Sequence, residues 1–140
     1  MPHLVILYTP NLERESDMGA LCRSLADTML GVQDDDGKQV FPTGGTRVLA
    51  YPAAHSAVAD GQQDYAFVYL NVRMAHGRSA QVHKRLGDAL LMAAKAHFQP
   101  VFMQRHIGMT LQIDEGHEVF DVKHSNLHPC LLYTSPSPRD

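Results

Sequence analysis

A proline stands directly behind the initiator methionine, ahead of the apolar run His-Leu-Val-Ile-Leu-Tyr. A small residue at this position permits removal of the methionine, and Pro2 would then carry a free secondary amine. A cyclic amine held at the start of a strand can accept a proton and return it. Proline is also tolerated at the first residue of a strand, since it has no backbone N–H to donate. The placement alone therefore admits both a catalytic and a purely structural interpretation.

Two arginines stand where an anion could be bound. Arg47 follows the loop Phe-Pro-Thr-Gly-Gly-Thr at the start of a predicted strand, and Arg78 lies at the mouth of a predicted helix. The helix macrodipole disfavours a cation at that end, whereas the same helix N-terminus attracts anions. A guanidinium binds a carboxylate through paired hydrogen bonds, so two of them suit a di- or tricarboxylate. Each arginine, taken singly, is better explained as an ordinary surface residue, and it is the combination with an N-terminal proline that favours a binding role.

The nine histidines raise the question of a metal site, but their spacing does not support one. His124 and His128 stand at helical spacing, yet the adjacent Pro129 argues against a helix there. The run Asp34-Asp35-Asp36 lacks the alternation and the closing glutamate of a calcium loop and predicts a solvated turn. Six further histidines lack the intervals of zinc ligands: His55, His76, His83, His97, His106 and His117. We therefore expect no metal site.

Other familiar catalytic patterns are missing from the sequence. Cys22 falls on the inner face of a predicted helix, which favours packing over nucleophilic attack. The chain has no Gly-x-Ser-x-Gly elbow, no P-loop and no dinucleotide fingerprint behind its first strand. The pair Gly44-Gly45 precedes a strand and not a helix, so it is no phosphate cradle. No cofactor is expected.

The elements that must position these residues form two similar units, each reading strand, helix, strand. Residues 4–8 and 46–51 are the predicted strands of the first unit, and Gly31 closes its helix. Residues 64–72 and 107–113 are the predicted strands of the second unit. Its helix is predicted to begin after the N-cap Ser79 and to end at Pro100. The inner face of the first helix comprises Met18, Leu21, Cys22, Leu25 and Met29, and that of the second comprises Val82, Leu86, Ala89, Leu90, Ala93 and His97.

These units predict an α/β (α+β) fold with the order βαββαβ. A strand–helix–strand crossover within one sheet is parallel, so two of them give a four-stranded sheet with both helices on one face. The other face would be left bare, although the strands Val-Ile-Leu-Tyr-Thr and Val-Tyr-Leu-Asn-Val supply it with apolar residues. A bare apolar face predicts an oligomer.

Length and composition limit the classes of partner. The chain has 140 residues, 44% hydrophobic and 19% charged, with a formal charge of −3, which indicates one soluble domain. The acidic balance argues against nucleic acid, and no apolar run approaches the roughly 18 residues of a membrane span. With two cysteines and no signal peptide, a cytoplasmic location is expected. Residues 1–129 are the predicted domain, and residues 130–140 a disordered or foreign tail.

Several stretches together resemble one family, the 5-carboxymethyl-2-hydroxymuconate isomerases of the tautomerase superfamily. They are MPH at the start, FPTGGTR at 41–47, ADGQQDYAFV at 59–68, GRS at 77–79 and NLHP at 126–129. The combination ADGQ-x-DYAFV followed by GRS is the specific part of the match, which covers residues 2 to about 129. The resemblance implies a βαββαβ subunit, a homotrimer and a cofactor-free isomerase in the homoprotocatechuate branch of aromatic catabolism.

The resemblance also implies roles for individual residues. Pro2, freed of Met1, would be the catalytic base, and Arg47 and Arg78 would bind carboxylates of the substrate and offset charge on its dienolate. An α-amine has an ordinary pKa of about 8. An apolar pocket beside two guanidiniums lowers that pKa and leaves the amine largely neutral at pH 7.

Some alternatives stay open at the level of the sequence. The substrate would be 5-carboxymethyl-2-hydroxymuconate or a close unsaturated carboxylate, but the same residues fit a tautomerase of another α-keto acid. A trimeric binding protein without activity would also retain this fold. Two stretches depart from the family pattern, namely the longer, more acidic segment 33–39 and everything after Pro129.

Overall fold

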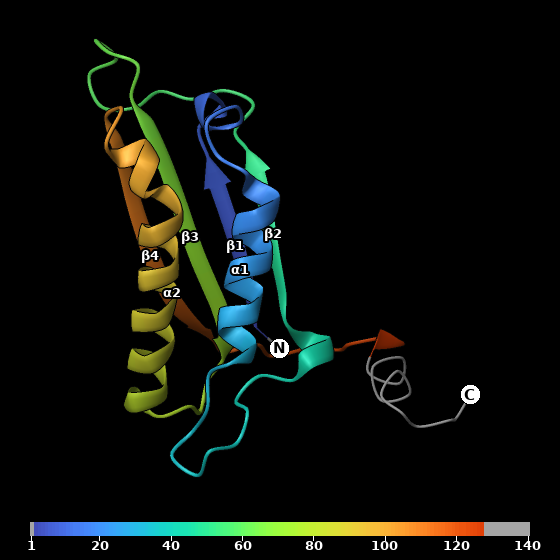
Figure 1. Ribbon diagram of the computed structural model, residues 1–140. Helices are drawn as coiled ribbons and strands as arrows, with labels where there is room; N and C mark the ends of the chain where they lie inside the picture. Colours follow the sequence, from blue (N-terminus) through green and yellow to red (C-terminus); the bar gives the residue numbers. More distant parts are fainter. Residues whose placement is uncertain (1, 128–140) are drawn as a thin grey trace.

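The computed structural model describes residues 2–127 of the chain. These residues form β1 (His3–Tyr8), α1 (Met18–Leu30), β2 (Arg47–Pro52), β3 (Ala66–Ala75), α2 (Ala80–Phe102) and β4 (Ile107–Gly116). Two short 3-10 helices, η1 (Pro10–Leu12) and η2 (Thr43–Gly45), precede α1 and β2 respectively. The predicted βαββαβ order is confirmed (Figure 1). Over the described range, no helix is long and apolar enough to cross a membrane.

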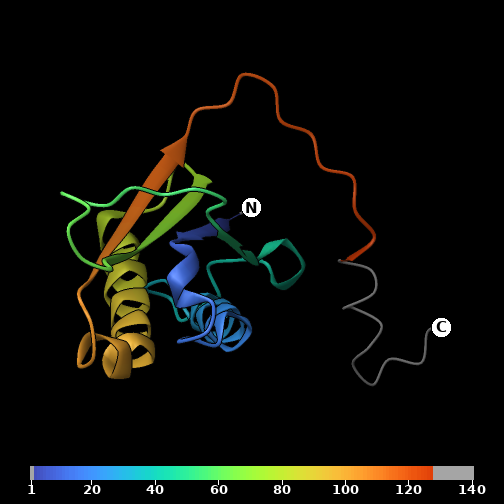
Figure 2. The ribbon, with the colours of Figure 1, turned by 90° about the horizontal axis from the view of Figure 1, so that it is seen from above.

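The strands form one mixed sheet in the order β2-β1-β3-β4. β1 pairs parallel with β2 and β3 parallel with β4, while β1 and β3 are antiparallel. The amino ends of β1 and β2 therefore meet the carboxyl ends of β3 and β4 at one edge. At that edge the register aligns Arg47, His3, Arg73 and Asp114 in a row across the four strands. Both helices pack on one face of the sheet, and the side chains of this row lie on the other face (Figure 2).

The helices begin and end where their sequence signals place them. The carboxylate of Asp17 accepts a hydrogen bond from the backbone N–H of Ala20 at 2.9 Å, and the Ser79 hydroxyl accepts one from the N–H of Val82 at 3.2 Å. Each satisfies a backbone donor that has no partner within the first turn of its helix. The predicted N-cap at Ser79 is confirmed, as is the end of α1 at Gly31.

The core lies between the sheet and the two helices. Alternate residues of β1 and β3 point toward the helices, as the period of a strand requires. Cys22 is partly buried against this core, and burial raises the pKa of its thiol, which supports the predicted packing role. The fully buried side chains include Leu4, Ile6, Leu21, Leu25, Val68, Leu70, Leu86, Leu90 and Phe98.

The predicted end of the second helix at Pro100 is wrong. α2 continues through Pro100 to Phe102. A proline in the last turn removes one backbone hydrogen bond. The turn that follows nevertheless packs Val101 beside Phe98 in the core, and burying one such side chain contributes about 1.5–3 kcal/mol. Tertiary packing therefore overrides the helix-ending signal of proline here.

The face of the sheet away from the helices is open. Leu7, Leu49 and Tyr51 lie on it and are 45%, 45% and 50% exposed. After β4 the chain continues as an extended segment, residues 117–127, here called the C-terminal arm. The arm extends away from the sheet on the side that the helices leave open (Figure 2), and its Val119 and Phe120 are almost fully exposed. The predicted tail, residues 130–140, falls outside the described residues.

Candidate active site

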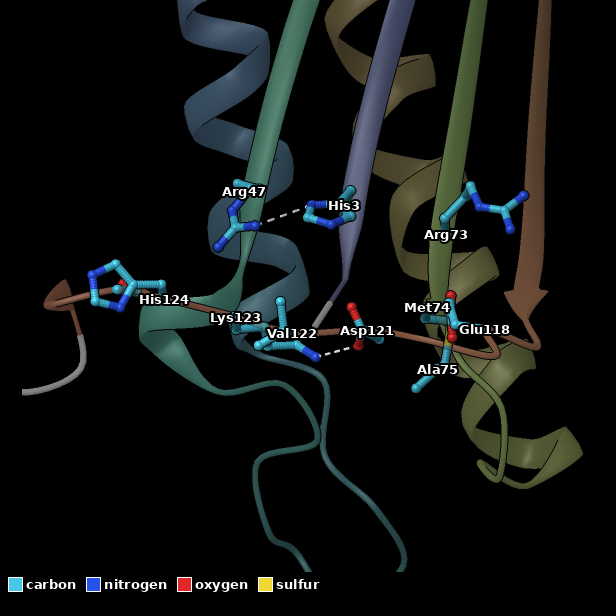
Figure 3. A pocket seen from close by; sticks show the side chains of 11 residues that line it. His3, Arg47, Arg73, Met74, Ala75, Glu118, Asp121, Val122, Lys123 and His124 are labelled. Atoms are coloured by element: carbon cyan, nitrogen blue, oxygen red, sulfur yellow. Dashed lines mark hydrogen bonds and ion pairs between the residues drawn. The ribbon is translucent and has the colours of Figure 1, made fainter.

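A cavity of about 350 Å³ lies at the edge where β1 and β2 begin. Its volume is at the lower end of the range for small-molecule sites. The ends of three strands form one side, and the C-terminal arm, which runs from the end of β4 toward β2, forms the other (Figure 3). The lining residues are His3, Arg47, Arg73, Met74, Ala75, Glu118, Asp121, Val122, Lys123, His124 and Ser125.

Pro2 is buried directly in front of β1. The residue that follows it, His3, lines the cavity and begins the strand. A proline at this position costs the sheet nothing, since it precedes the first residue of the ladder. The residue predicted to be the base therefore lies one position along the chain from the cavity wall.

Arg47 and His3 form the central polar contact of the cavity. The two residues are paired in register on β2 and β1, so their side chains lie on the same face of the sheet. Arg47 donates from Nη1 to Nδ1 of His3 at 3.4 Å (Figure 3). Burial, and then the positive charge of Arg47, lower the pKa of His3. His3 is therefore neutral at pH 7 and can accept this hydrogen bond, which orients the guanidinium.

Arg73 is a second cavity arginine that the sequence did not single out. It pairs with His3 across β3 and β1 and is exposed on the open face. Nothing in the spacing of residues near position 73 marks it as functional. Its place becomes evident only from the register of two strands that are far apart along the chain. The cavity thus has an arginine on either side of His3.

Arg78, the other predicted arginine, does not line the cavity in this chain. It is exposed just before α2, and its Nη2 donates to the backbone carbonyl of Val40 at 3.1 Å. Val40 belongs to the connection between α1 and β2, so Arg78 ties this connection to the amino end of α2. The structure brings Arg47 to the cavity, in register with His3, and leaves Arg78 outside it, in front of α2.

The acidic segment 33–39 is an ordered turn within that connection. An isolated bridge pairs Gln33 with Gln39, and one carboxylate oxygen of Asp34 accepts from the backbone N–H groups of Asp36 and Lys38. These hydrogen bonds lower the pKa of Asp34. The turn predicted for the aspartate run is therefore confirmed. Arg85 on α2 also holds the turn by donating to the carbonyl of Gln33 at 3.0 Å.

The C-terminal arm contributes charge of both signs to the cavity. Asp121 forms an ion pair with Lys123, and this contact lowers the pKa of Asp121. The negative charge of Asp121 favours protonation of His3, but the larger effects of burial and Arg47 outweigh it. Counting Arg47, Arg73 and Lys123 against Glu118 and Asp121, the lining carries more positive than negative groups. The site is therefore suited to an anionic ligand.

Four histidines outside the cavity take part in three local contacts. The pairs are His76 with His117 (ring centroids 5.0 Å apart), His83 with Glu115 (Nε2 to Oε2, 2.8 Å) and His97 with Ser16 (Nε2 to Oγ, 2.7 Å). Burial lowers the pKa of His97. Among residues 2–127, no group of three or more histidine, cysteine, aspartate or glutamate side chains could hold a metal ion.

Comparison with known proteins decides the family. The chain matches the profile of 5-carboxymethyl-2-hydroxymuconate isomerase over residues 2–131. It belongs to this isomerase family. A curated relative, the 5-carboxymethyl-2-hydroxymuconate Delta-isomerase of Escherichia coli, is 27% identical over 128 residues, which cover 91% of this chain and 97% of that protein.

Solved structures of 5-carboxymethyl-2-hydroxymuconate isomerases share the fold over nearly the whole length. One crystal structure of a delta-isomerase is 57% identical with a TM-score of 0.90, covering 94% of this chain and 93% of that one. Another, from Deinococcus radiodurans R1, is 35% identical with a TM-score of 0.82, covering 93% of both chains. The resemblance first noted in the sequence is therefore confirmed, and the homologues of this isomerase-family chain are enzymes.

Proposed function

We propose that the protein is a cofactor-free isomerase of 5-carboxymethyl-2-hydroxymuconate, or of a close unsaturated carboxylate, in the catabolism of homoprotocatechuate. The amine of Pro2 acts as the base. The observation that carries the proposal is the position of Pro2, buried directly before β1 at the strand edge that holds Arg47. Membership of the isomerase family supports the choice of substrate.

The reaction is an internal proton transfer. Removal of Met1 exposes the secondary amine of Pro2, which accepts the proton of the substrate's enol hydroxyl. As the carbonyl forms, the double bonds of the diene shift, and the protonated amine returns its proton to a carbon of the chain. Nothing is oxidised or reduced. Because the ordinary pKa of an α-amine is about 8, burial and the nearby charge of Arg47 favour the neutral amine that the first step needs.

The arginines bind and stabilise the substrate. Arg47 is oriented by His3 and would hold a carboxylate of the substrate while offsetting the negative charge of the dienolate. We propose Arg78 as a further carboxylate partner. Its guanidinium donates to the carbonyl of Val40 and is otherwise exposed, which keeps N–H donors available to an anion.

The proposal includes a cytoplasmic homotrimer. The support for assembly is the open face of the sheet, on which Leu7, Leu49 and Tyr51 remain about half exposed. Contact with other copies would remove this apolar area from water. Light scattering on the purified protein should give the mass of a trimer. A stable monomer at micromolar concentration would contradict this part of the proposal.

The experiment that tests the base is a comparison of one protein with and without a blocked amine. The chain is produced with a short cleavable extension before Pro2, and the isomerase rate is measured before and after cleavage, with intact mass confirming each form. We expect activity only once the Pro2 amine is free, with the same oligomeric state in both forms. Full activity in a chain shown by mass to retain residues before Pro2 would overturn the mechanism.

A further inference from the structure

The row of residues at the cavity edge carries more cationic charge than the proposed chemistry at Pro2 uses. Across β2, β1 and β3 the row reads Arg47, His3, Arg73, and all three side chains line the same cavity. Arg47 is engaged by His3. Arg73 has no ion pair within 4.0 Å among the described residues.

The acid that stands in register with Arg73 is occupied by other donors. Asp114 is its register partner on β4. The carboxylate of Asp114 instead accepts from Asn71 Nδ2 at 2.8 Å and from Gln112 Nε2 at 3.1 Å. Arg105 shows what a neutralised arginine looks like in this protein, since its guanidinium contacts the carboxylates of Glu15 and Asp64 at 2.8 Å each. Arg73 therefore presents an uncompensated guanidinium on the outer face of the sheet. In Figure 3 its side chain extends toward β4, away from His3, and rotation about its side-chain bonds would bring the guanidinium onto an anion bound in the cavity.

We propose that Arg73 binds the carboxylate of the carboxymethyl branch and makes the site selective for tricarboxylates over dicarboxylates. The inference rests on the proposed function and assigns it one further binding residue. Neighbouring strands lie about 4.8 Å apart, so the Cα atoms of Arg47 and Arg73, one strand to either side of β1, are separated by about 10 Å. The two guanidiniums can thus hold separate carboxylates of one substrate.

The geometry of the substrate favours the branch as the partner of Arg73. The conjugated muconate chain is planar and stiff, and its enol end must meet Pro2, close to Arg47. The branch carboxylate is attached through a saturated carbon, so it can rotate out of that plane and reach across β1. A site that hydrogen-bonds a charged group discriminates strongly against an analogue lacking it, because the cation is then left without its partner.

The test compares two substrates in matched variants. Arg73→Gln and Arg73→Lys are measured with 5-carboxymethyl-2-hydroxymuconate and with 2-hydroxymuconate, which lacks the branch. The control is Arg14→Gln, which removes an equal charge from an exposed arginine at the opposite end of the sheet, between η1 and α1. Both kcat and KM are determined for every pair.

We expect Arg73→Gln to raise KM for the tricarboxylate about tenfold or more, the scale of a lost charged contact, with little change in kcat. The dicarboxylate should be turned over as by the wild type, and Arg73→Lys should recover part of the loss. Arg14→Gln should leave the ratio of kcat/KM between the substrates unchanged. An equal effect of Arg73→Gln on both substrates, or none on either, would overturn the assignment.

A failure of the proposed function would be recognised separately, since the wild type would then turn over neither substrate. In that event calorimetric titration of 5-carboxymethyl-2-hydroxymuconate into the wild type and Arg73→Gln still decides the role of Arg73. Weaker binding to Arg73→Gln, with unchanged binding to Arg14→Gln, would support it. Equal affinity of all three proteins would overturn it.

Discussion

Replacing Arg47 by alanine tests the centre of the site most directly. The substitution removes the guanidinium that donates to His3 Nδ1 at 3.4 Å and that lines the cavity beside Pro2. It leaves the cavity with Arg73 and Lys123 as its cations. Two consequences follow, one for catalysis and one for the titration of His3.

The expected catalytic loss is larger than any loss of stability. Removing one partner of a partly buried charged contact costs about 2–4 kcal/mol in kcat/KM. At about 1.4 kcal/mol for each factor of ten, this corresponds to a fall of roughly 30- to 1000-fold. The hydrogen bond to His3 is long and has a neutral acceptor, so its loss should cost about 0.5–1 kcal/mol of unfolding free energy and lower Tm by roughly 2–5 °C.

The assay combines kinetics with a titration of His3 by NMR. The charge of Arg47 is one of the two main causes of the low pKa of His3, so Arg47→Ala should raise that pKa toward its ordinary value. Arg47→Lys should retain most of the effect on His3, because it keeps the charge, but it should recover little activity, because an ammonium cannot reproduce the paired hydrogen bonds of a guanidinium. The matched control is Arg23→Ala on α1, which breaks an exposed ion pair with Asp27.

Wild-type kcat/KM in Arg47→Ala would remove this residue from the site. An unchanged titration of His3 in the same variant would refute the electrostatic account of its neutral state. A comparable loss of activity in Arg23→Ala would show that general destabilisation, and not a missing carboxylate partner, explains the effect.

Three further results are expected. The ascending limb of the pH profile of kcat/KM should report an amine with a pKa below its ordinary value of about 8, and Pro2→Ala should lower the rate severely while leaving some activity; a profile flat through this range would contradict an amine base. Burial lowers the pKa of His97 in the folded state, so as the pH falls the unfolded chain binds the proton first. The contribution of neutral His97 to the free energy of unfolding is therefore fully present above about pH 6.5 and is lost as the pH falls through the folded-state pKa. His97→Gln should flatten that acid limb in urea unfolding, and an unchanged slope would count against it. Burial and the hydrogen bond to Glu13 raise the pKa of Tyr8 to about 12, so ultraviolet titration should show a late phenolate step that is lost in Tyr8→Phe, and an unchanged titration curve would contradict this assignment.

Much of the fold was evident from local signals in the sequence. Strand runs and the helical spacing of apolar residues are properties of short segments, and the Asp34–Gly37 turn and the Ser79 N-cap depend on hydrogen bonds between residues close along the chain. Such features are decided by neighbouring residues, and most of them agree with the structure. The inner face predicted for α2 is wrong beyond Leu90, because Ala94, Phe98 and Val101 are buried there, whereas Ala93 and His97 are only partly buried. The predicted end at Pro100 is wrong as well, because the helix continues to Phe102 with Val101 buried in the core.

The residues of the candidate site also fall into two groups, those that the sequence marks and those that only the tertiary structure places. Pro2 and Arg47 could be named from the sequence, since one occupies the start of the chain and the other stands in a recognisable motif. Arg73 and the arm residue Asp121 could not, because their positions depend on the strand register and on the path of the chain after β4. Residues far apart in sequence come together only when the sheet forms. The sequence by itself therefore determined the order of elements and the motif-bearing residues, whereas the tertiary structure decided which charges share the cavity.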